Sequence, residues 1–113
     1  MREHDDRLYL IHIQECIVRI EQYTAEGKSA FLSDTRTQDA VLRNLHTLAE
    51  STQRISEALK ASRSDVNWRG IAAFRNVVVH DYLGIDLKYI WDIVEHDLPG
   101  LKRAVEGMLA ELK

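Results

Sequence analysis

Residues 87–112, with the sequence LKYIWDIVEHDLPGLKRAVEGMLAEL, carry the clearest repeat in the chain and decide its fold class. Their apolar residues recur every three or four positions, which is the period of a helix with one buried side. They are Leu87, Ile90, Trp91, Val94, Leu98, Leu101, Val105, Met108 and Leu112. The phase continues through Pro99, which lacks an amide hydrogen and crowds the carbonyl of Glu95. We therefore expect one helix kinked at Pro99, or two nearly coaxial helices.

Residues 5–25 form a second segment with helical periodicity. One face carries Tyr9, Ile13, Cys16, Ile20 and Tyr23 at helical spacing. A second apolar face carries Leu8, Ile11 and Val18. A helix that is apolar on two faces needs two sets of partners, and one of these sets could belong to another subunit.

Two further segments complete the predicted architecture. Residues 35–61 carry one apolar stripe, and Thr35-Arg36-Thr37-Gln38 has the spacing of a capping box at its start. Residues 68–82 are nearly apolar all round, and the run of valines at positions 77–79 is also compatible with a buried strand. A helix is favoured there, because no other segment alternates in a way that offers a partner strand. The prediction is an all-α, antiparallel bundle of four to five helices.

The composition is that of an ordinary soluble globular protein. The 113 residues are 45% hydrophobic and 29% charged, which suits a single domain over residues 1–113. A net charge of −3 argues against a protein that coats nucleic acid by charge alone, although a local basic cleft stays possible. Cys16 is the only cysteine, so an intramolecular disulfide and a multi-thiolate zinc cluster are excluded.

Neither a membrane nor a metal is expected from the sequence. No apolar run reaches the roughly 18 residues that a membrane span needs, and the charged N-terminus is unlike a secretory signal. A cytoplasmic protein is therefore predicted. The histidines His4, His12, His46 and His96 are scattered, and no pair has the His-x-x-x-His spacing of a helical zinc site. We expect no metal and no cofactor.

The helix predicted over residues 68–82 contains an unusual group of polar residues. At about 100° per residue, Arg75 and Tyr82 fall near the middle of the apolar arc, and Asn76 and His80 lie together on its flank. A guanidinium cannot lose its charge, so Arg75 must meet a carboxylate, an anion or water.

Two interpretations of this helix remain open. In the first, Arg75 pairs with a buried carboxylate and His80 lies at the helix end, both in structural roles. In the second, Arg75 and His80 line a cleft for a phosphate, where Arg holds the phosphoryl group and His moves a proton. Periodicity alone slightly favours the first interpretation.

The stretch FRNVVVHDY at residues 74–82 resembles the Arg-x-x-x-x-His-x-Tyr signature of HepT-type proteins in the HEPN superfamily. The resemblance extends to VNWRGI at residues 66–71, to YLGID at 82–86 and to Ile90-Trp91, and helix order and chain length also fit. It implies a HEPN-like helical bundle that dimerises, so that the Arg and His of both copies share one cleft. It also implies RNA cleavage without a metal, leaving a cyclic phosphate.

The resemblance further implies a role for each motif residue. Arg75 would hold the phosphate, His80 would transfer a proton, and Asn76 would support them. Tyr82 would be adenylylated by a nucleotidyltransferase antitoxin of the MntA type, which silences the toxin. The implied function is a metal-independent endoribonuclease toxin of a type II/VII-like toxin–antitoxin pair, acting on RNA and not on DNA.

Two other functions are compatible with the same residues. The chain could be a non-catalytic helical partner subunit of a minimal nucleotidyltransferase, in which Arg75 and His80 bind a nucleotide or phosphate. It could also be a dimeric scaffold with an internal Arg–carboxylate pair. Arg63, Arg69, Lys60, Arg43 and Arg54 could add a basic rim to a cleft, although a plain exposed charge is the commoner role for each.

Overall fold

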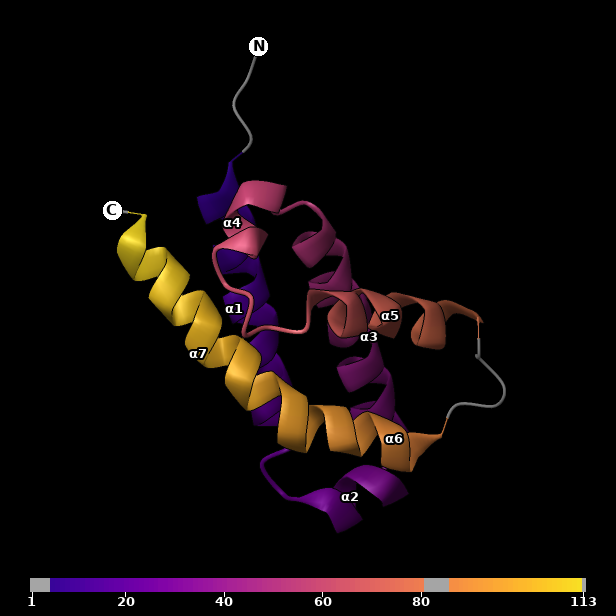
Figure 1. Cartoon of the computed structure of the whole chain (residues 1–113). Helices are drawn as coiled ribbons and strands as arrows, with labels where there is room; N and C mark the ends of the chain where they lie inside the picture. The colour runs from indigo at the N-terminus through magenta and orange to yellow at the C-terminus, as the bar shows by residue number, and fades with distance from the viewer. Residues whose placement is uncertain (1–4, 81–85, 113) are drawn as a thin grey trace.

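The computed structural model describes residues 5–80 and 86–112, and the side chains of residues 75–80 lie outside what it describes (Figure 1). The elements are α1 (Asp6–Tyr23), α2 (Lys28–Ser33), α3 (Thr35–Gln53), α4 (Glu57–Ala61), α5 (Trp68–His80), α6 (Leu87–Asp92), the π-helical turn η1 (Ile93–Asp97) and α7 (Leu98–Glu111). Within these ranges there is no strand, and the all-α prediction is confirmed. None of the described helices is both long and apolar enough to cross a bilayer.

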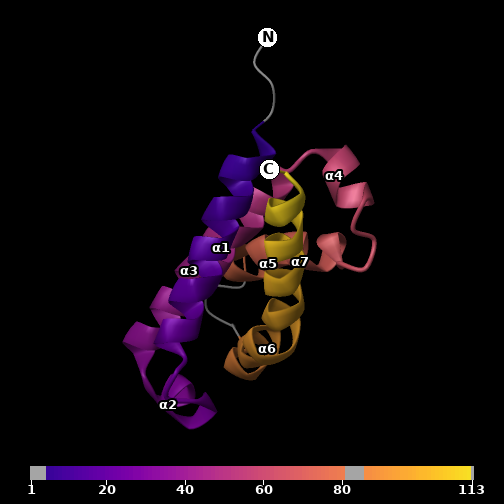
Figure 2. The same ribbon diagram turned by 90° about the vertical axis from the view of Figure 1, so that its left-hand side faces the viewer.

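Four long helical segments make the body of the molecule, as the sequence predicts. α1 and α3 run antiparallel and pack along their length, α5 packs on α3, and α7 packs on α1 (Figures 1 and 2). The short helices α2 and α4 are additional to the prediction, and α2 packs on α3 and α6. The motif helix α5 is therefore anchored on α3, with α6 and α7 on its other side (Figure 1).

The core lies where α1, α3 and α7 meet. Its fully buried side chains include Ile13, Leu45 and Val105, one from each of these helices. Cys16 is also fully buried, as predicted, and burial raises the pKa of its thiol. Leu8 and Val18 on the second face of α1 remain 56% and 39% exposed. Within the described part of the chain, the second face of α1 thus keeps exposed apolar side chains.

Residues 35–61 form two helices, so the prediction of one helix over this segment is wrong. α3 ends at Gln53, and α4 begins again at Glu57 after the N-cap residue Ser56. The Asp6 carboxylate accepts hydrogen bonds from the Ser56 amide at 2.8 Å and from the Ser56 hydroxyl at 2.7 Å. This contact, made across 50 residues, holds the start of α4 against α1.

The start of α3 also differs from the predicted capping box at Thr35. The N-cap residue is Asp34, whose carboxylate accepts from the Arg36 amide at 3.0 Å and from the Thr37 hydroxyl at 2.9 Å. The Gln38 amide donates instead to the carbonyls of Phe31 and Leu32, at 2.9 and 3.1 Å. Gln38 therefore joins α3 to α2 rather than closing the predicted box.

The helix continues from α6 through η1 into α7, and the irregular turn η1 lies before Pro99. Residues Ile93–Asp97 form a π-helical turn in which the Leu98 amide donates to the Ile93 carbonyl, five residues earlier. Pro99 lies in the first turn of α7, where its missing amide hydrogen costs little. The wider turn places the distortion around Glu95, the residue whose carbonyl a proline ring would crowd. Figure 1 shows the resulting change of direction between α6 and α7.

Candidate functional site

The residues of the predicted site fall in the part of α5 and the following segment that the structure describes least. α5 includes the positions of Arg75, Asn76 and His80, but their side chains lie outside the described part. Tyr82 lies outside the described residues altogether. The structure therefore places the motif on a helix as far as His80, and the roles of these four residues stay predictions.

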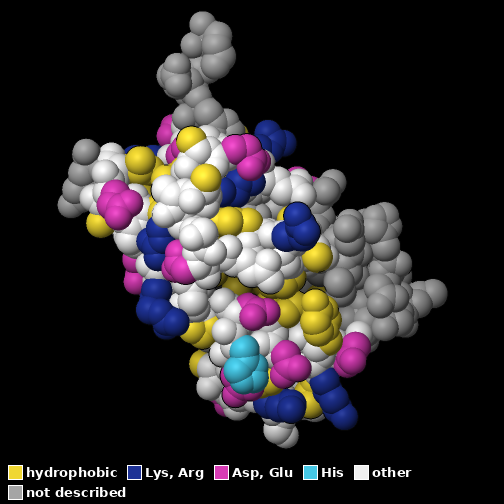
Figure 3. Space-filling model, viewed as in Figure 1, with side chains coloured by type: hydrophobic (Ala, Val, Ile, Leu, Met, Phe, Trp, Pro, Cys, Tyr) yellow, Lys and Arg dark blue, Asp and Glu magenta, His cyan; other side chains and the backbone are white. Residues whose placement is uncertain are grey.

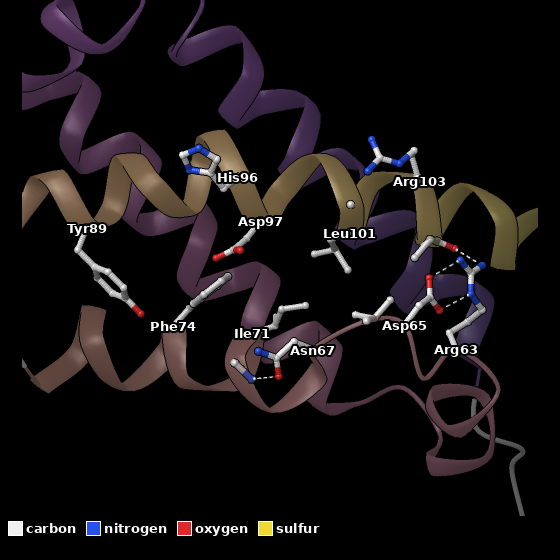
Figure 4. Close-up of a pocket in the computed structure, with 14 residues that line it drawn as sticks. Arg63, Asp65, Asn67, Ile71, Phe74, Tyr89, His96, Asp97, Leu101 and Arg103 are labelled. Carbon is white, nitrogen blue, oxygen red and sulfur yellow. Dashed lines mark hydrogen bonds and ion pairs between the residues drawn. The ribbon is translucent and has the colours of Figure 1, made fainter.

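A cleft of about 640 Å³ lies beside the first half of this helix. We call it the α5–α7 cleft, because one wall is formed by α5 with the loop before it, and the other by α6, η1 and α7 (Figure 4). Its floor is apolar and contains Ile71, Phe74 and Leu101, which are 6%, 4% and 3% exposed. Figure 3 shows this face, with apolar side chains in the hollow and charged side chains around it. Phe74 immediately precedes Arg75, so the described floor of the cleft is adjacent in sequence to the predicted motif.

Asn67 and Gly70 shape the end of the cleft at the start of α5. The Asn67 Oδ1 accepts a hydrogen bond from the Gly70 amide at 3.0 Å. A Cβ on residue 70 would lie 2.5 Å from Asn67 Nδ2, so glycine leaves room for the amide group. The Asn67 oxygen is thus used within the protein, while its Nδ2 group faces the cleft with donor capacity (Figure 4).

Arg63 and Asp65 form the fixed end of the cleft. Arg63 Nε and Nη2 donate to the two Asp65 carboxylate oxygens, each at 3.1 Å, and Nη1 donates to the Ala104 carbonyl on α7 at 3.4 Å. The hydrogen bond from Arg63 lowers the pKa of the Asp65 carboxyl below its ordinary value. A Cβ on Gly107 would come within 2.9 Å of Arg63 Nη1, so this glycine lets the guanidinium lie on α7. Arg63 therefore links the loop before α5 to α7, and its positive charge is paired with the Asp65 carboxylate.

The opposite wall presents polar groups without partners in the described part of the chain. Tyr89 projects from α6 with 43% of its surface exposed, and Asp97 points into the cleft from η1 (Figure 4). Arg103 lies on the rim. Within the described ranges, no hydrogen bond or ion pair joins the side chain of Tyr89, Asp97 or Arg103 to another residue. Toward a ligand, the Tyr89 hydroxyl can donate or accept a hydrogen bond, the Asp97 carboxylate can accept, and the Arg103 guanidinium can donate and attract an anion.

The π-helical turn also carries a group of possible metal ligands. Asp92, Glu95 and His96 place one ligand atom each within 4.8 Å of one another, and all three residues are exposed. Over the described residues no other set of three His, Cys, Asp or Glu side chains meets this spacing. An exposed acidic group of this kind is common on protein surfaces, and we assign it no metal.

The sequence did not predict this cleft. Arg63, named above as a residue that could add a basic rim to a cleft, lines it, whereas Lys60 pairs with Glu57 at 3.3 Å. Asn67, Tyr89 and Asp97 were not identified as site residues. The spacing of Asn67 to Gly70 could have indicated a helix cap. Nothing in the sequence could have placed Asp97 opposite Asn67, because thirty positions separate them.

The comparisons with known proteins agree on one family. The family described as HepT-like, ribonuclease HepT-like, matches residues 13–108 of this chain. The "Probable ribonuclease HepT" of Thermococcus cleftensis is 37% identical over 108 residues, covering 95% of this chain and 96% of the relative. The "mRNA nuclease HepT" of Shewanella oneidensis is 27% identical over 123 positions, covering 88% of this chain and 92% of the relative. No solved structure matches the chain significantly.

Proposed function

Because the chain belongs to the HepT-like ribonuclease family, we propose that it is a metal-independent endoribonuclease toxin with Arg75 and His80 as its catalytic residues. The observation that carries the proposal is the family match over residues 13–108, which contains the whole Arg-x-x-x-x-His-x-Tyr motif. The relatives named as a ribonuclease and as an mRNA nuclease support RNA as the substrate.

The proposed reaction needs only the two motif side chains. His80 removes the proton from a ribose 2′-hydroxyl, and the 2′-oxygen attacks the adjacent phosphorus. The bond from phosphorus to the 5′-oxygen breaks, which leaves a 2′,3′-cyclic phosphate, and the released 5′-oxygen takes a proton from water to become a hydroxyl. Arg75 offsets the negative charge that develops on the phosphoryl oxygens in the transition state. Asn76 supports this pair as a hydrogen-bonding neighbour.

We further propose that the active form is a homodimer. Leu8 and Val18 on the second face of α1 are 56% and 39% exposed, which leaves apolar surface for a partner. A partner copy would bring a second Arg75 and His80 to a shared cleft. The same copy would add positive charge locally to a chain whose net charge is −3.

The proposed regulation acts on Tyr82. A nucleotidyltransferase antitoxin of the MntA type would adenylylate its hydroxyl, as expected for one half of a type II/VII-like toxin–antitoxin pair. The added phosphate is negatively charged and would repel the incoming RNA phosphate. This arrangement needs no contact between the antitoxin and the core of the toxin.

The test is cleavage of a broad RNA panel by the purified protein in EDTA. We expect cleavage by the wild type and a loss of at least about a hundredfold in Arg75→Ala and in His80→Ala. Arg36→Ala and His46→Ala are matched controls, because Arg36 lies in the first turn of α3 and His46 lines the groove between α1 and α3. These controls should cleave like the wild type.

The contradicting results are equally specific. An intact panel with wild-type dimer, together with no mass increment on Tyr82 after co-expression with a nucleotidyltransferase partner, would refute the toxin proposal. Binding of RNA or nucleotide without cleavage would instead identify the non-catalytic partner subunit. A Tyr82→Phe variant must show no increment if Tyr82 is the modified residue.

A further inference from the structure

We propose that the α5–α7 cleft binds a guanine base of the RNA, held over the apolar floor beside Tyr89 and hydrogen-bonded by Asp97 and Asn67. This inference rests on the proposed ribonuclease function and assigns it a base-reading subsite. The volume of about 640 Å³ lies within the range of small-molecule sites and is ample for one nucleotide.

The cleft has the surfaces that a single-stranded base requires. A base buries its two faces on apolar or aromatic side chains and exposes hydrogen-bonding groups along its edges. Phe74 and Ile71 give the floor, and the ring of Tyr89 stands beside it with 43% of the residue exposed (Figure 4). An exposed aromatic ring on the rim of an apolar floor is a stacking platform for a base.

The polar groups of the cleft select among the four bases. The Asp97 carboxylate is an acceptor with two oxygens, and guanine alone carries two adjacent donors, N1–H and N2–H, on its Watson–Crick edge. Asn67 offers Nδ2 as a donor from the facing wall, because its oxygen already accepts from Gly70. Guanine has adjacent acceptors, O6 and N7, for that donor. Adenine, cytosine and uracil each leave the Asp97 carboxylate with at most one base donor.

The rim then supplies a cation for the backbone of the RNA. Arg103 forms no ion pair within the described part of the chain, so its charge remains available to a phosphate. Arg63 is different, because Asp65 already accepts two of its hydrogen bonds. Among the described residues, the cleft therefore offers the Asp97 carboxylate to the base and the Arg103 guanidinium to the strand.

The position of the cleft relates the base to the predicted reaction. Phe74 lies on the floor, and His80 follows six residues later on the same helix. At a rise of 1.5 Å per residue this is about 9 Å along the axis. A base in the cleft would therefore belong to a nucleotide close to the scissile phosphate. The expected consequence is cleavage at a fixed, short distance from a guanosine.

Two measurements on the purified protein test the proposal. The first is binding of the four nucleoside 5′-monophosphates, followed by saturation-transfer NMR, which needs no catalysis. The wild type should prefer GMP by about tenfold. Asp97→Asn should abolish the preference, and Tyr89→Leu should weaken the binding of GMP at least about fivefold.

The second measurement maps cleavage sites in random-sequence RNA. Wild type should show guanosine enriched at one position, and Asp97→Asn should lose that enrichment. Glu106→Gln and Tyr23→Leu are matched controls, since Glu106 faces the groove between α1 and α7 and Tyr23 ends α1. Both controls should keep the wild-type pattern.

The outcomes separate this inference from the ribonuclease proposal. Cleavage without guanosine enrichment, unchanged by Asp97→Asn, would overturn the guanine subsite and leave the ribonuclease standing. GMP preference without any cleavage would support the subsite and refute the ribonuclease. If Asp97→Asn and Tyr89→Leu weakened binding to a protein partner but left the binding of nucleotides unchanged, the subsite would be overturned in favour of a protein-docking cleft.

Discussion

Two hollows on this molecule contain similar residue types but differ in how their polar groups are used. The groove between α1 and α3, about 430 Å³, is lined by Tyr9, His12, His46, Thr47, Glu50, Ser51 and Arg54. His12 Nδ1 lies 2.8 Å from the Ser51 hydroxyl, and His46 lies 3.9 Å from Glu50. In the α5–α7 cleft, by contrast, Tyr89 and Asp97 have no partner within the described residues.

This difference indicates that the polar groups of the α1–α3 groove stabilise the fold, whereas those of the α5–α7 cleft are suited to a ligand. A buried polar group with an internal partner stabilises the protein, whereas a group left open in a cleft contributes little until a ligand arrives. The α1–α3 groove lies over the most closely packed helix pair, and the hydrogen bond between His12 and Ser51 joins the two helices. The α5–α7 cleft separates α5 from α7, and at one end Arg63 joins the loop before α5 to α7.

The largest expected difference in the free energy of unfolding is between two leucine-to-alanine substitutions, one in each region. Leu45→Ala empties a closed site in the α1–α3 core, where Leu45 is fully buried, and should cost about 3–4 kcal/mol. Leu101→Ala only widens the open cleft, so it should cost about 2 kcal/mol, the transfer term without the cavity term. Urea unfolding measures both losses, with Leu112→Ala as an exposed control. Equal losses would mean that the cleft is closed in solution.

A smaller difference in the free energy of unfolding is expected between substitutions of one polar group in each hollow. Ser51→Ala removes the partner of His12 and should lower the free energy of unfolding by about 1 kcal/mol. Asp97→Asn breaks no described interaction and should change it by less than about 0.5 kcal/mol. Thermal unfolding at neutral pH measures the two variants side by side. A loss in Asp97→Asn as large as that in Ser51→Ala would show that the carboxylate has an internal partner and is not free for a ligand.

Periodicity predicted α1, α3 and the segment from α6 to α7, because the apolar residues of each recur at helical spacing, and that signal is local. The helix α5 was predicted because no other segment offered a partner strand. Periodicity missed the break between α3 and α4, because Ile55 and Leu59 continue the apolar phase across it. The break depends on Asp6, which bonds Ser56 from 50 residues away. A contact of that range leaves no period in the sequence.

The candidate site also has one part that could be predicted from the sequence and one part that could not. The motif residues Arg75, His80 and Tyr82 were identified from a short linear pattern, and the family match confirms the family in which that pattern was expected. The cleft beside them was not predicted, because Asn67 and Asp97 come together only when α5 and η1 are placed side by side. Asp97 occupies the N-cap position of α7 without making a side-chain cap bond.

The smallest expected effect is on the ion pair at the fixed end of the cleft. The folded-state pKa of Asp65 lies below its ordinary value, chiefly because Arg63 donates hydrogen bonds to its carboxylate. The pair therefore contributes stability that is fully present above the ordinary aspartate pKa of about 3.9, and this contribution is lost as the pH falls through the lowered pKa. Arg63→Gln should return the pKa of Asp65 toward its ordinary value, which a ¹³C NMR titration of the carboxyl groups would show.

Asp34 is the internal control for this titration. Its pKa is also lowered, but chiefly by the Thr37 hydroxyl and with help from backbone amides of α3. It should stay low in Arg63→Gln, because Arg63 plays no part in that cap. Since Asp65 is exposed, the loss of its partner should leave stability at neutral pH nearly unchanged. An Asp65 pKa that does not move would show that Arg63 is not bound to it in solution. The cleft would then have a second mobile guanidinium, beside Arg103, to offer to an RNA phosphate.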